Sequence, residues 1–181
     1  MKFVAHQVGV NAVSWSPYSS PGALTSTEAA AAVAVPRLAS GGCDNLVKVW
    51  QFAAARQEWE AAATLDGHSD WVRDVAWAPN VGLPYSTIAS CGQDGLVLMW
   101  TQGDAVGAPW NKTPLTKEPF KAPVWRVSWS VTGGILAVSA GDNQVTLWKE
   151  ALDHQWHCLS QLAAAGDADA ASAAAAAAGA H

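Results

Sequence analysis

Tryptophan is the feature that most constrains what this chain can fold into, because nine of its 11 tryptophans fall into three sets of three. Each set marks one position in a unit that occurs three times. Trp50, Trp100 and Trp148 each end an equivalent five-residue segment and lie 50 and 48 residues apart. A repeat with this period is typical of the blades of a β-propeller. The other two series are Trp15, Trp77 and Trp129, and Trp59, Trp110 and Trp156.

The middle unit, residues 68–100, carries the pattern most fully. Its first segment alternates with a period of two, which predicts a strand. Residues 87–91 form a second short strand, and Asp94-Gly95 predicts a tight hairpin with a positive φ at both positions. Residues 96–100 are apolar throughout, as expected for a strand buried on both faces. The alternation puts Trp71, Arg73, Val75 and Trp77 on one face and Val72, Asp74 and Ala76 on the other.

The same plan in all three units predicts an all-β fold of about twelve strands, four to each blade, with no helix. A short helix over residues 51–65 is the alternative, because alanines cluster there. We favour a strand, since residues 155–162 occupy the matching place without that alanine bias. The predicted strands are 8–15, 37–42, 46–52 and 59–65; 71–77, 87–91, 96–100 and part of 110–120; and 124–130, 135–140, 145–149 and 155–162.

The three blades span about 6–65, 68–120 and 124–162 within a domain of residues 1–162. Residues 18–36, rich in Ser, Pro and Ala, form a surface insertion in this interpretation. Residues 163–181 are mostly alanine and are expected to form a disordered tail, too weakly apolar to span a membrane.

Composition limits the classes of partner. The net charge is −5 with no basic patch, which argues against nucleic acid. Three cysteines, an odd number, fit a reducing compartment better than a disulfide framework. Residues 1–4 lack the long apolar core of a signal peptide.

Polar residues recur at fixed distances from the tryptophan that ends the third strand. Ser90 lies ten residues before Trp100 and Asp94 lies six before it, and His68 opens the same unit. An imidazole, a hydroxyl, a carboxylate and an indole N–H can form a closed hydrogen-bonded tetrad, with each bond contributing about 0.5–1.5 kcal/mol. The first unit repeats the offsets with His6, Ser40, Asp44 and Trp50. The third keeps only Asp142 and Trp148, so its network should be weaker.

Ser, His and Asp also make a hydrolase triad. Because the set occurs twice at matching offsets, we interpret it as architectural and expect no catalytic residue and no cofactor. Cys43, Cys91 and Cys158 lack the close pairing of a zinc site, so no metal is expected. Tryptophans at strand period beside Val and Leu are assigned to the core instead of to base stacking.

The Gly67-His68 entry, the Asp turns and the third-strand tryptophans resemble the WD-repeat propeller family over residues 6–162. Longer segments resemble one branch of it, the small propeller subunits shared by the outer cage of the COPII vesicle coat and the Y-shaped scaffold of the nuclear pore. These segments are ASGGCDNLVKVW (39–50), HSDWVRDVAWAPNVGLP (68–84), STIASCGQDG (86–95), VSWSVTGGILAVSAGDNQVTLWKE (127–150) and Gln155-Trp156.

This resemblance implies a non-catalytic scaffold in ER-to-Golgi transport and in the nuclear pore complex. In that family six blades leave a ring open, and a partner inserts a further blade: the elongated cage protein in the coat, or a helical nucleoporin in the pore. The three units here resemble the last three of the six, half of an open propeller, and residues 124–130 would lie nearest the axis beside the gap. We expect a fragment, a truncated gene model or a chain completed from elsewhere, poorly soluble alone because exposed strand edges invite association.

The resemblance also implies location: the cytoplasmic face of the ER membrane and COPII vesicles, and the nuclear pore. No membrane insertion, nucleic acid or small-molecule substrate is expected. The alternative is another WD-repeat adaptor or substrate receptor, which would bind peptides on the propeller face around an open channel. An enzyme would need a nucleophile or metal cluster outside the repeat, and the sequence offers neither.

Overall fold

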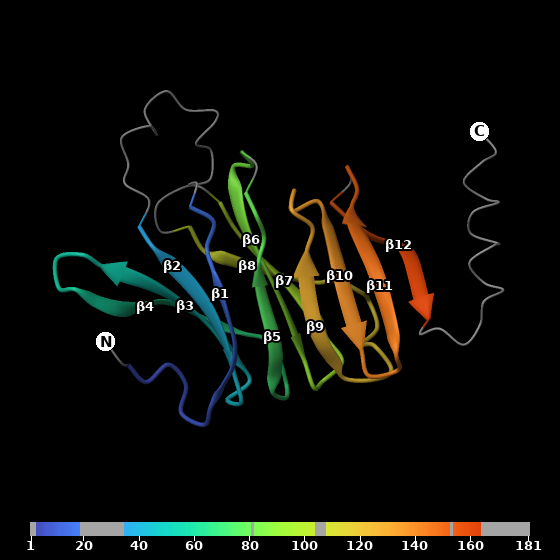
Figure 1. Cartoon of the computed structure of the whole chain (residues 1–181), viewed down its shortest axis with the longest axis horizontal. Helices are drawn as coiled ribbons and strands as arrows, with labels where there is room; N and C mark the ends of the chain where they lie inside the picture. Colours follow the sequence, from blue (N-terminus) through green and yellow to red (C-terminus); the bar gives the residue numbers. More distant parts are fainter. Residues whose placement is uncertain (1–2, 19–34, 81, 104–107, 153, 164–181) are drawn as a thin grey trace.

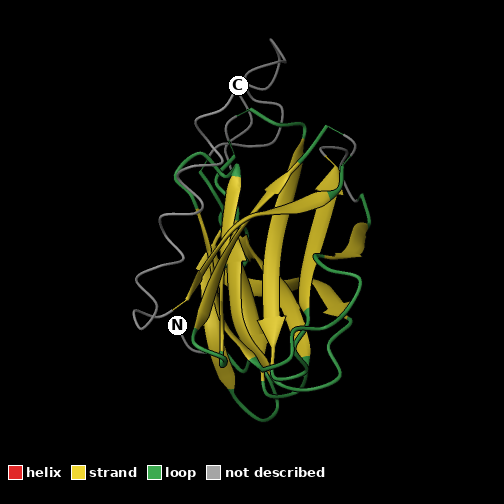
Figure 2. Ribbon diagram, turned by 90° about the vertical axis from the view of Figure 1, so that its right-hand side faces the viewer, coloured by secondary structure: helices red, strands yellow, loops and turns green. Residues whose placement is uncertain are grey.

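Twelve strands form three four-stranded antiparallel sheets in the computed structural model, which describes residues 3–18, 35–80, 82–103, 108–152 and 154–163 (Figure 1). The described part contains no helix, and therefore none long and apolar enough to cross a membrane (Figure 2). The first sheet is β1 (Val10–Trp15), β2 (Arg37–Gly42), β3 (Leu46–Ala53) and β4 (Glu58–Asp66). The second is β5 (Val72–Trp77), β6 (Tyr85–Gly92), β7 (Val97–Gly103) and β8 (Trp110–Pro114). The third is β9 (Val124–Trp129), β10 (Ile135–Ala140), β11 (Gln144–Glu150) and β12 (Trp156–Ala163).

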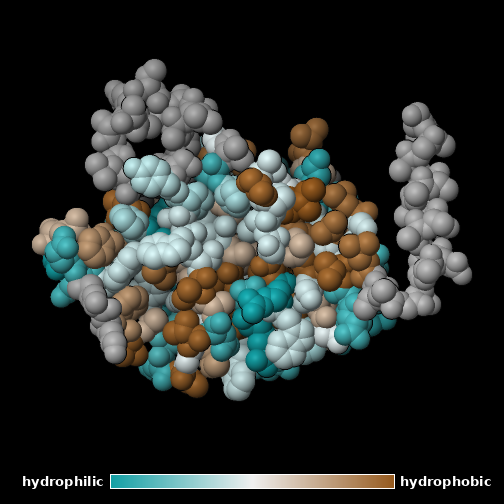
Figure 3. Space-filling model, in the orientation of Figure 1, coloured by the Kyte–Doolittle hydropathy of each residue, from teal (hydrophilic) through white to brown (hydrophobic). Residues whose placement is uncertain are grey.

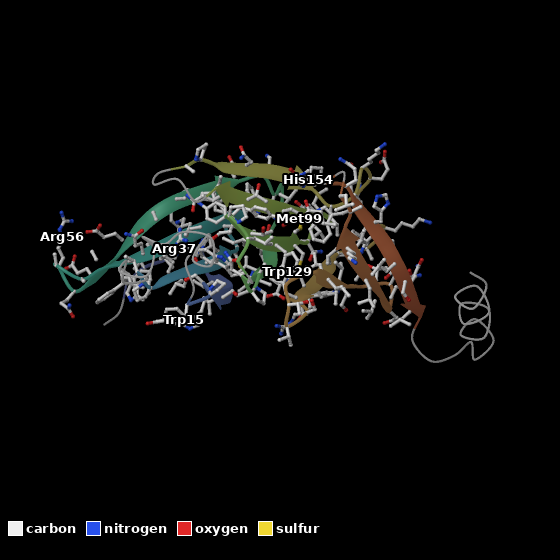
Figure 4. The ribbon with its side chains drawn as sticks, turned by 90° about the horizontal axis from the view of Figure 1, so that it is seen from above. Trp15, Arg37, Arg56, Met99, Trp129 and His154 are labelled. Atoms are coloured by element: carbon white, nitrogen blue, oxygen red, sulfur yellow. The ribbon has the colours of Figure 1, made fainter. Side chains whose placement is uncertain are left out.

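Each sheet is a meander whose strands follow the order of the chain. The first strands of the three sheets, β1, β5 and β9, lie side by side in the middle of the molecule (Figure 1). The sheets are arranged in an open series (Figure 4). The predicted all-β fold of three four-stranded blades is thus confirmed, and the helix considered for residues 51–65 is wrong. The tail expected over 163–181 and the insertion over 18–36 fall almost entirely outside the described residues.

The hairpin between β6 and β7 corrects one prediction. Of the pair Asp94-Gly95, only Gly95 has a positive φ, at 74°. The Gly95 N–H donates to the Gly92 carbonyl at 3.2 Å, so Gln93 and Asp94 occupy the centre of the turn and Gly95 follows it. Asn45 and Asn143 take the same position in the other sheets, with φ of 66° and 61°. A three-residue loop of this kind needs only its last residue in the left-handed region.

A β-bulge corrects a second prediction, the strict alternation along β5. The pairing of β5 with β6 shifts register between Val72 and Asp74. One residue is left over there, so Val72 lies on the same face as Val75 and Trp77. Equivalent shifts occur at Val10/Ala12 and opposite Val124, so the bulge belongs to the repeat.

The hydrophobic core lies between the sheets in two separate clusters. The first joins one face of the first sheet, including Val47 and Val49, to Val72 and Trp77 of the second. The second joins the opposite face of the second sheet, including Met99, to Val124 and Leu136 of the third. Each such side chain contributes about 1.5–3 kcal/mol when buried. A sheet therefore gains its stability from its neighbours more than from its own strands.

We predict that Gly95→Ala destabilises the fold by about 1–2 kcal/mol or more, because an L-residue is strained at this φ. A Cβ on Gly95 would also lie 2.6 Å from the Phe120 carbonyl oxygen. The measurement is the free energy of unfolding in urea. The matched change Asn143→Gly, at a φ of 61°, should cost little. Equal losses from the two changes would contradict this account of the turn.

Candidate structural tetrads and open sheet faces

The four residues singled out in the second unit lie together in the second sheet. The Trp100 indole N–H donates to Ser90 Oγ at 2.8 Å, and Ser90 Oγ lies 2.9 Å from His68 Nε2. His68 Nδ1 lies 3.0 Å from Asp94 Oδ2. Because a carboxylate only accepts, the Nδ1–H of His68 donates to it, and in the neutral imidazole Nε2 then accepts the Ser90 hydroxyl proton. The chain of bonds connects the segment before β5 with β6, β7 and the turn between them.

The first sheet repeats this geometry. The Trp50 indole donates to Ser40 Oγ at 2.8 Å, Ser40 Oγ lies 2.8 Å from His6 Nε2, and His6 Nδ1 lies 2.7 Å from Asp44 Oδ1. His6 holds residues 3–9 against this sheet. Lys48 Nζ adds a bond to the Ala5 carbonyl oxygen at 2.8 Å.

The third sheet does not bring Asp142 and Trp148 together in a shared network. The Trp148 indole donates instead to Thr146 Oγ1 at 2.8 Å, and Asp142 Oδ1 accepts the Gln144 backbone N–H at 3.2 Å. Val138 is buried at the place of the missing serine. Sequence reasoning missed Thr146, although a hydroxyl two residues before the tryptophan was the available signal.

The two tetrad carboxyls are stabilised in their charged form. Burial alone would raise the pKa of Asp94, but the hydrogen bond and electrostatic attraction of the His68 N–H and the backbone N–H groups of Leu96 and Ser69 outweigh it and hold that pKa below its usual value. The pKa of Asp44 is lowered in the same way by His6 and Leu46, with a contribution from Lys48. Both carboxylates therefore favour the folded state near neutral pH.

The tetrads offer poor geometry for catalysis. Ser90 and Ser40 are fully buried and each already accepts an indole N–H, whereas a nucleophile must reach its substrate. Of the three cysteines, Cys91 is buried and its pKa is raised by that burial, Cys158 is exposed, and Cys43 is partly buried. In the described ranges, no three His, Cys, Asp or Glu side chains gather where they could hold a metal ion.

Polar contacts between sheets were not foreseen from the sequence. Asp74 Oδ2 accepts the Val127 backbone N–H at 3.1 Å, and Ser14 Oγ accepts the Trp77 N–H at 2.9 Å. The Trp129 indole donates to the Ala76 carbonyl oxygen at 3.0 Å. Arg37 lies over the Trp77 ring, 5.2 Å from its centroid. These contacts hold each sheet against the next. They join residues of different repeat units, so the pattern within one unit does not predict them.

Each sheet has a leading face, toward the sheet before it in the chain, and a trailing face, toward the sheet after it. On the leading face, β1, β5 and β9 carry equivalent residues, as their register against the second strands shows. Val72, Val75 and Trp77 are 5% exposed or less. Their equivalents in the first sheet are Val10, Val13 and Trp15, at 47%, 66% and 64%.

The leading face of the first sheet is therefore uncovered. Hydrophobic residues reach the surface over β1 in Figure 3, and Trp15 lies at the lower edge of the first sheet in Figure 4. Trp15 packs on Trp59 of its own sheet, 5.7 Å between ring centroids, in the way that Trp77 packs on Trp110. The same apolar surface that forms a core in the second sheet faces solvent here.

The trailing face of the third sheet is uncovered as well. Leu162 is 55% exposed and Val145 and Leu147 are half-buried. Their equivalents on the other trailing faces are all 5% exposed or less. These are Val47, Val49 and Leu65 in the first sheet, and Val97, Met99 and Leu115 in the second.

A third exposed feature lies near the start of the inner strands. The Arg73 guanidinium lies between the rings of Trp71 and Trp125, 5.2 Å and 4.7 Å from their centroids. Gln93 Oε1 accepts two bonds from the same group. Both tryptophans are nearly half exposed.

Comparison with known proteins finds the same three repeat units. The family model described as WD domain, G-beta repeat matches residues 1–51, 59–101 and 113–149. The chain is 54% identical over 159 residues to Protein SEC13 homolog of Homo sapiens, covering 87% of this chain and 48% of that protein. It is 48% identical over 179 residues to Protein transport protein SEC13 of Mycosarcoma maydis, covering 87% and 49%. It is 55% identical over 136 residues to Protein transport protein SEC13 homolog A of Arabidopsis thaliana, covering 75% and 43%. The chain spans about half the length of these curated relatives.

We predict that Asp94→Asn lowers the free energy of unfolding at neutral pH by about 1–3 kcal/mol, because it weakens hydrogen bonds to a charged acceptor. The folded-state pKa of Asp94 is depressed, so its contribution is present above the unfolded-state pKa of about 3.9 and is lost as the pH falls through the folded value. Urea unfolding from pH 7 to pH 2 should therefore show a shallower acid decline in the variant.

The control is Asp142→Asn, which removes an exposed carboxylate outside any tetrad. Its unfolding curve should match the parent protein within about 0.5 kcal/mol. An Asp94→Asn curve parallel to the parent at every pH would refute the role assigned to this carboxylate.

Proposed function

This chain belongs to the WD domain, G-beta repeat family, and from that premise we propose that it is a non-catalytic structural scaffold of protein transport. We propose further that it serves in the COPII coat cage in ER-to-Golgi transport and in the Y-shaped scaffold of the nuclear pore. Its place would be at the cytoplasmic face of the ER membrane and its vesicles, and at the pore.

One observation carries this proposal. Over 75–87% of its length the chain is 48–55% identical in sequence to relatives named protein transport protein SEC13 or a homolog of it. The matched region covers 75–87% of this chain, so it is longer than the three stretches that match the repeat model.

The open faces support binding by completion. A further sheet laid on an uncovered face would bury the same apolar residues that form the core at the two junctions inside the chain. Main-chain edges and alternating side-chain pockets are the usual means by which β-rich modules take up a partner's strand or sheet. The partners proposed are the elongated cage protein of the coat and the helical nucleoporin of the pore.

The tetrads are structural in this proposal. Each connects the entry segment of a sheet to its second and third strands through groups that are already satisfied and shielded from solvent. The sheets are thereby made rigid blocks, which suits a scaffold that must transmit load without changing shape. In this proposal the blades span about 6–65, 68–120 and 124–162, so that each blade contains one four-stranded sheet.

We expect the tagged chain to capture the coat cage protein and the nucleoporin scaffold from a cell extract, with quantitative mass spectrometry as the readout. Leu147→Asp should reduce that capture at least about tenfold, because it places a charge on the trailing face of the third sheet. The control Leu152→Asp changes a fully exposed leucine in the β11–β12 turn and should leave capture unchanged. Recovery of peptide-motif proteins or ligase components in their place would favour the alternative, a substrate receptor using the exposed Trp71 and Trp125 with the half-buried Arg73 between them.

We also predict that Ser90→Ala costs about 1–3 kcal/mol of stability, since it leaves the Trp100 indole N–H and His68 Nε2 without their buried partner. Thermal or urea unfolding measures the loss, with the exposed Ser69→Ala as control. A fluorophosphonate probe, which labels activated serines, should not react with Ser90 in the folded protein. Labelling of Ser90 that disappears with His68→Ala would overturn the structural role and support hydrolysis.

A further inference from the structure

Trp71, Arg73, Gln93 and Trp125, which we call the arginine cluster, lie where the second and third sheets meet. The inner strands of these sheets, β5 and β9, lie side by side (Figure 1). Arg73 and Trp125 are the residues left unpaired at the bulges of these two strands. A bulge re-aims the side chain of its extra residue, and here the two re-aimed side chains meet. The cluster therefore belongs to a junction inside the chain and not to an uncovered end face.

The other units show that the repeat does not require these large side chains. Asn11 is the bulge residue of β1, and its Nδ2 donates to the Val72 carbonyl oxygen across the first junction at 2.7 Å. Gly9 and Pro123 occupy the place of Trp71 in the other two units. A short amide thus takes the bulge position at the first junction, whereas the second junction carries a guanidinium and two indoles.

Arg73 is held in place by neighbours that carry no charge. Its Nε and Nη2 donate to Gln93 Oε1 at 3.0 Å and 2.5 Å. The Gln93 backbone N–H donates in turn to the Trp71 carbonyl oxygen at 2.9 Å, which connects the guanidinium to the segment before β5. None of the ion pairs within the described ranges includes Arg73. The guanidinium is thus fixed in position, and its charge has no carboxylate partner in that part of the chain.

One edge of the Arg73 guanidinium remains available to a ligand. Gln93 occupies the edge formed by Nε and Nη2, so the edge formed by Nη1 and Nη2 keeps its N–H donors. This terminal edge is the fork that binds a carboxylate through paired hydrogen bonds. Because indole rings lie on both faces of the guanidinium, a ligand reaches it in its own plane, between Trp71 and Trp125.

We propose that the arginine cluster binds an acidic peptide segment of a partner protein. An Asp or Glu carboxylate of the peptide accepts from the Arg73 fork, and its apolar neighbours pack on Trp71 and Trp125, which are 45% and 47% exposed. Tryptophan and arginine are the residue types that most often dominate interface energies. A guanidinium already fixed by Gln93 loses little further freedom on binding.

A carboxylate suits this site better than a phosphate does. A single guanidinium without a counter-charge matches the single charge of a carboxylate. A phosphate group carries close to two charges at neutral pH and is usually met by a cluster of arginines. The peptide class is therefore an unmodified acidic segment with apolar neighbours.

This inference adds a second kind of contact to the proposed scaffold and does not rest on it. Binding by completion would use the end faces, where Leu147→Asp is the test. The arginine cluster lies at the junction of the second and third sheets, so its variants leave those faces unchanged. Failure of one proposal is thus distinguishable from failure of the other.

The experiment selects binders from a displayed library of random peptides on the folded 181-residue chain, immobilised through its C-terminus. The enriched peptides should share an Asp or Glu beside an aliphatic or aromatic residue. Fluorescence anisotropy then gives the dissociation constant of the most enriched peptide. Arg73→Gln should raise that constant at least about tenfold. Arg73→Lys should do the same, because lysine keeps the charge but lacks the fork.

A double-mutant cycle is the decisive arm. Replacing the acidic residue of the peptide by its amide should weaken binding to the parent chain about tenfold, and should have little further effect on Arg73→Gln. The control Arg56→Gln removes an exposed arginine of the β3–β4 turn, outside the cluster, and should bind like the parent. Urea unfolding checks that each variant is folded. If Arg73→Gln unfolds, Arg73→Lys takes its place in the cycle.

The other outcomes count against the proposal. Selection that enriches no peptide, or peptides without an acidic residue, overturns the carboxylate site. Equal affinity for the parent and for the folded Arg73 variants overturns the role of the fork and leaves the cluster a contact between sheets. Tighter binding after phosphoserine replaces the acidic residue would assign the site to phosphate instead.

Discussion

The packing of one sheet's trailing face on the next sheet's leading face is the interaction on which this structure depends. A four-stranded meander is too thin to bury a core of its own, and here both hydrophobic clusters lie between sheets. Stability therefore comes from a repeated junction in which Val, Val and Trp from an inner strand meet apolar side chains of the preceding sheet. Each additional sheet both completes one junction and opens another.

Polar groups stabilise both the individual sheets and the junctions between them. The buried tetrads join the entry segment of the first and second sheets to the strands behind it, and their carboxylates are kept ionised by histidine and backbone N–H groups. The hydrogen bond that Asp74 accepts from the Val127 backbone N–H then fixes the position of the third sheet relative to the second. Burial raises the pKa of the Asp74 carboxyl. The hydrogen bonds that it accepts from two backbone N–H groups only partly offset that rise. The third sheet lacks the tetrad and relies on Trp148 with Thr146.

This arrangement connects stability with function. An open series of sheets leaves one apolar half-junction at each end, and the proposed function uses these exposed faces as the places where a partner would bind. Propeller relatives of the same family span about twice the length of this chain. In that proposal, a partner would be recognised by supplying a sheet of matching shape, because the exposed residues are the equivalents of core positions elsewhere in the repeat.

Much of this fold could be predicted from the sequence, because each repeat unit of a propeller carries its own strand and turn signals. Tryptophan spacing, strand alternation and Asp-containing turns determined the number of strands, their order and near-correct limits, such as residues 135–140 for β10. The offsets from Trp100 and Trp50 likewise predicted the serine and the aspartate of each tetrad, and the histidine at the start of each unit was the fourth member. These features are encoded within one unit, so periodicity alone can reveal them.

Other features were decided only by tertiary structure. Strand pairing decides several details that residue types do not specify. These are the bulge at Val72, the single positive φ at Gly95 and the hydrogen bond between Trp148 and Thr146. The bond from Asp74 to Val127 and the contrast between exposed Val13 and buried Val75 depend on which sheet lies beside which. A sequence pattern records that a face is apolar. Whether that face is core or surface is decided by the neighbour that covers it, and that neighbour is found only in three dimensions.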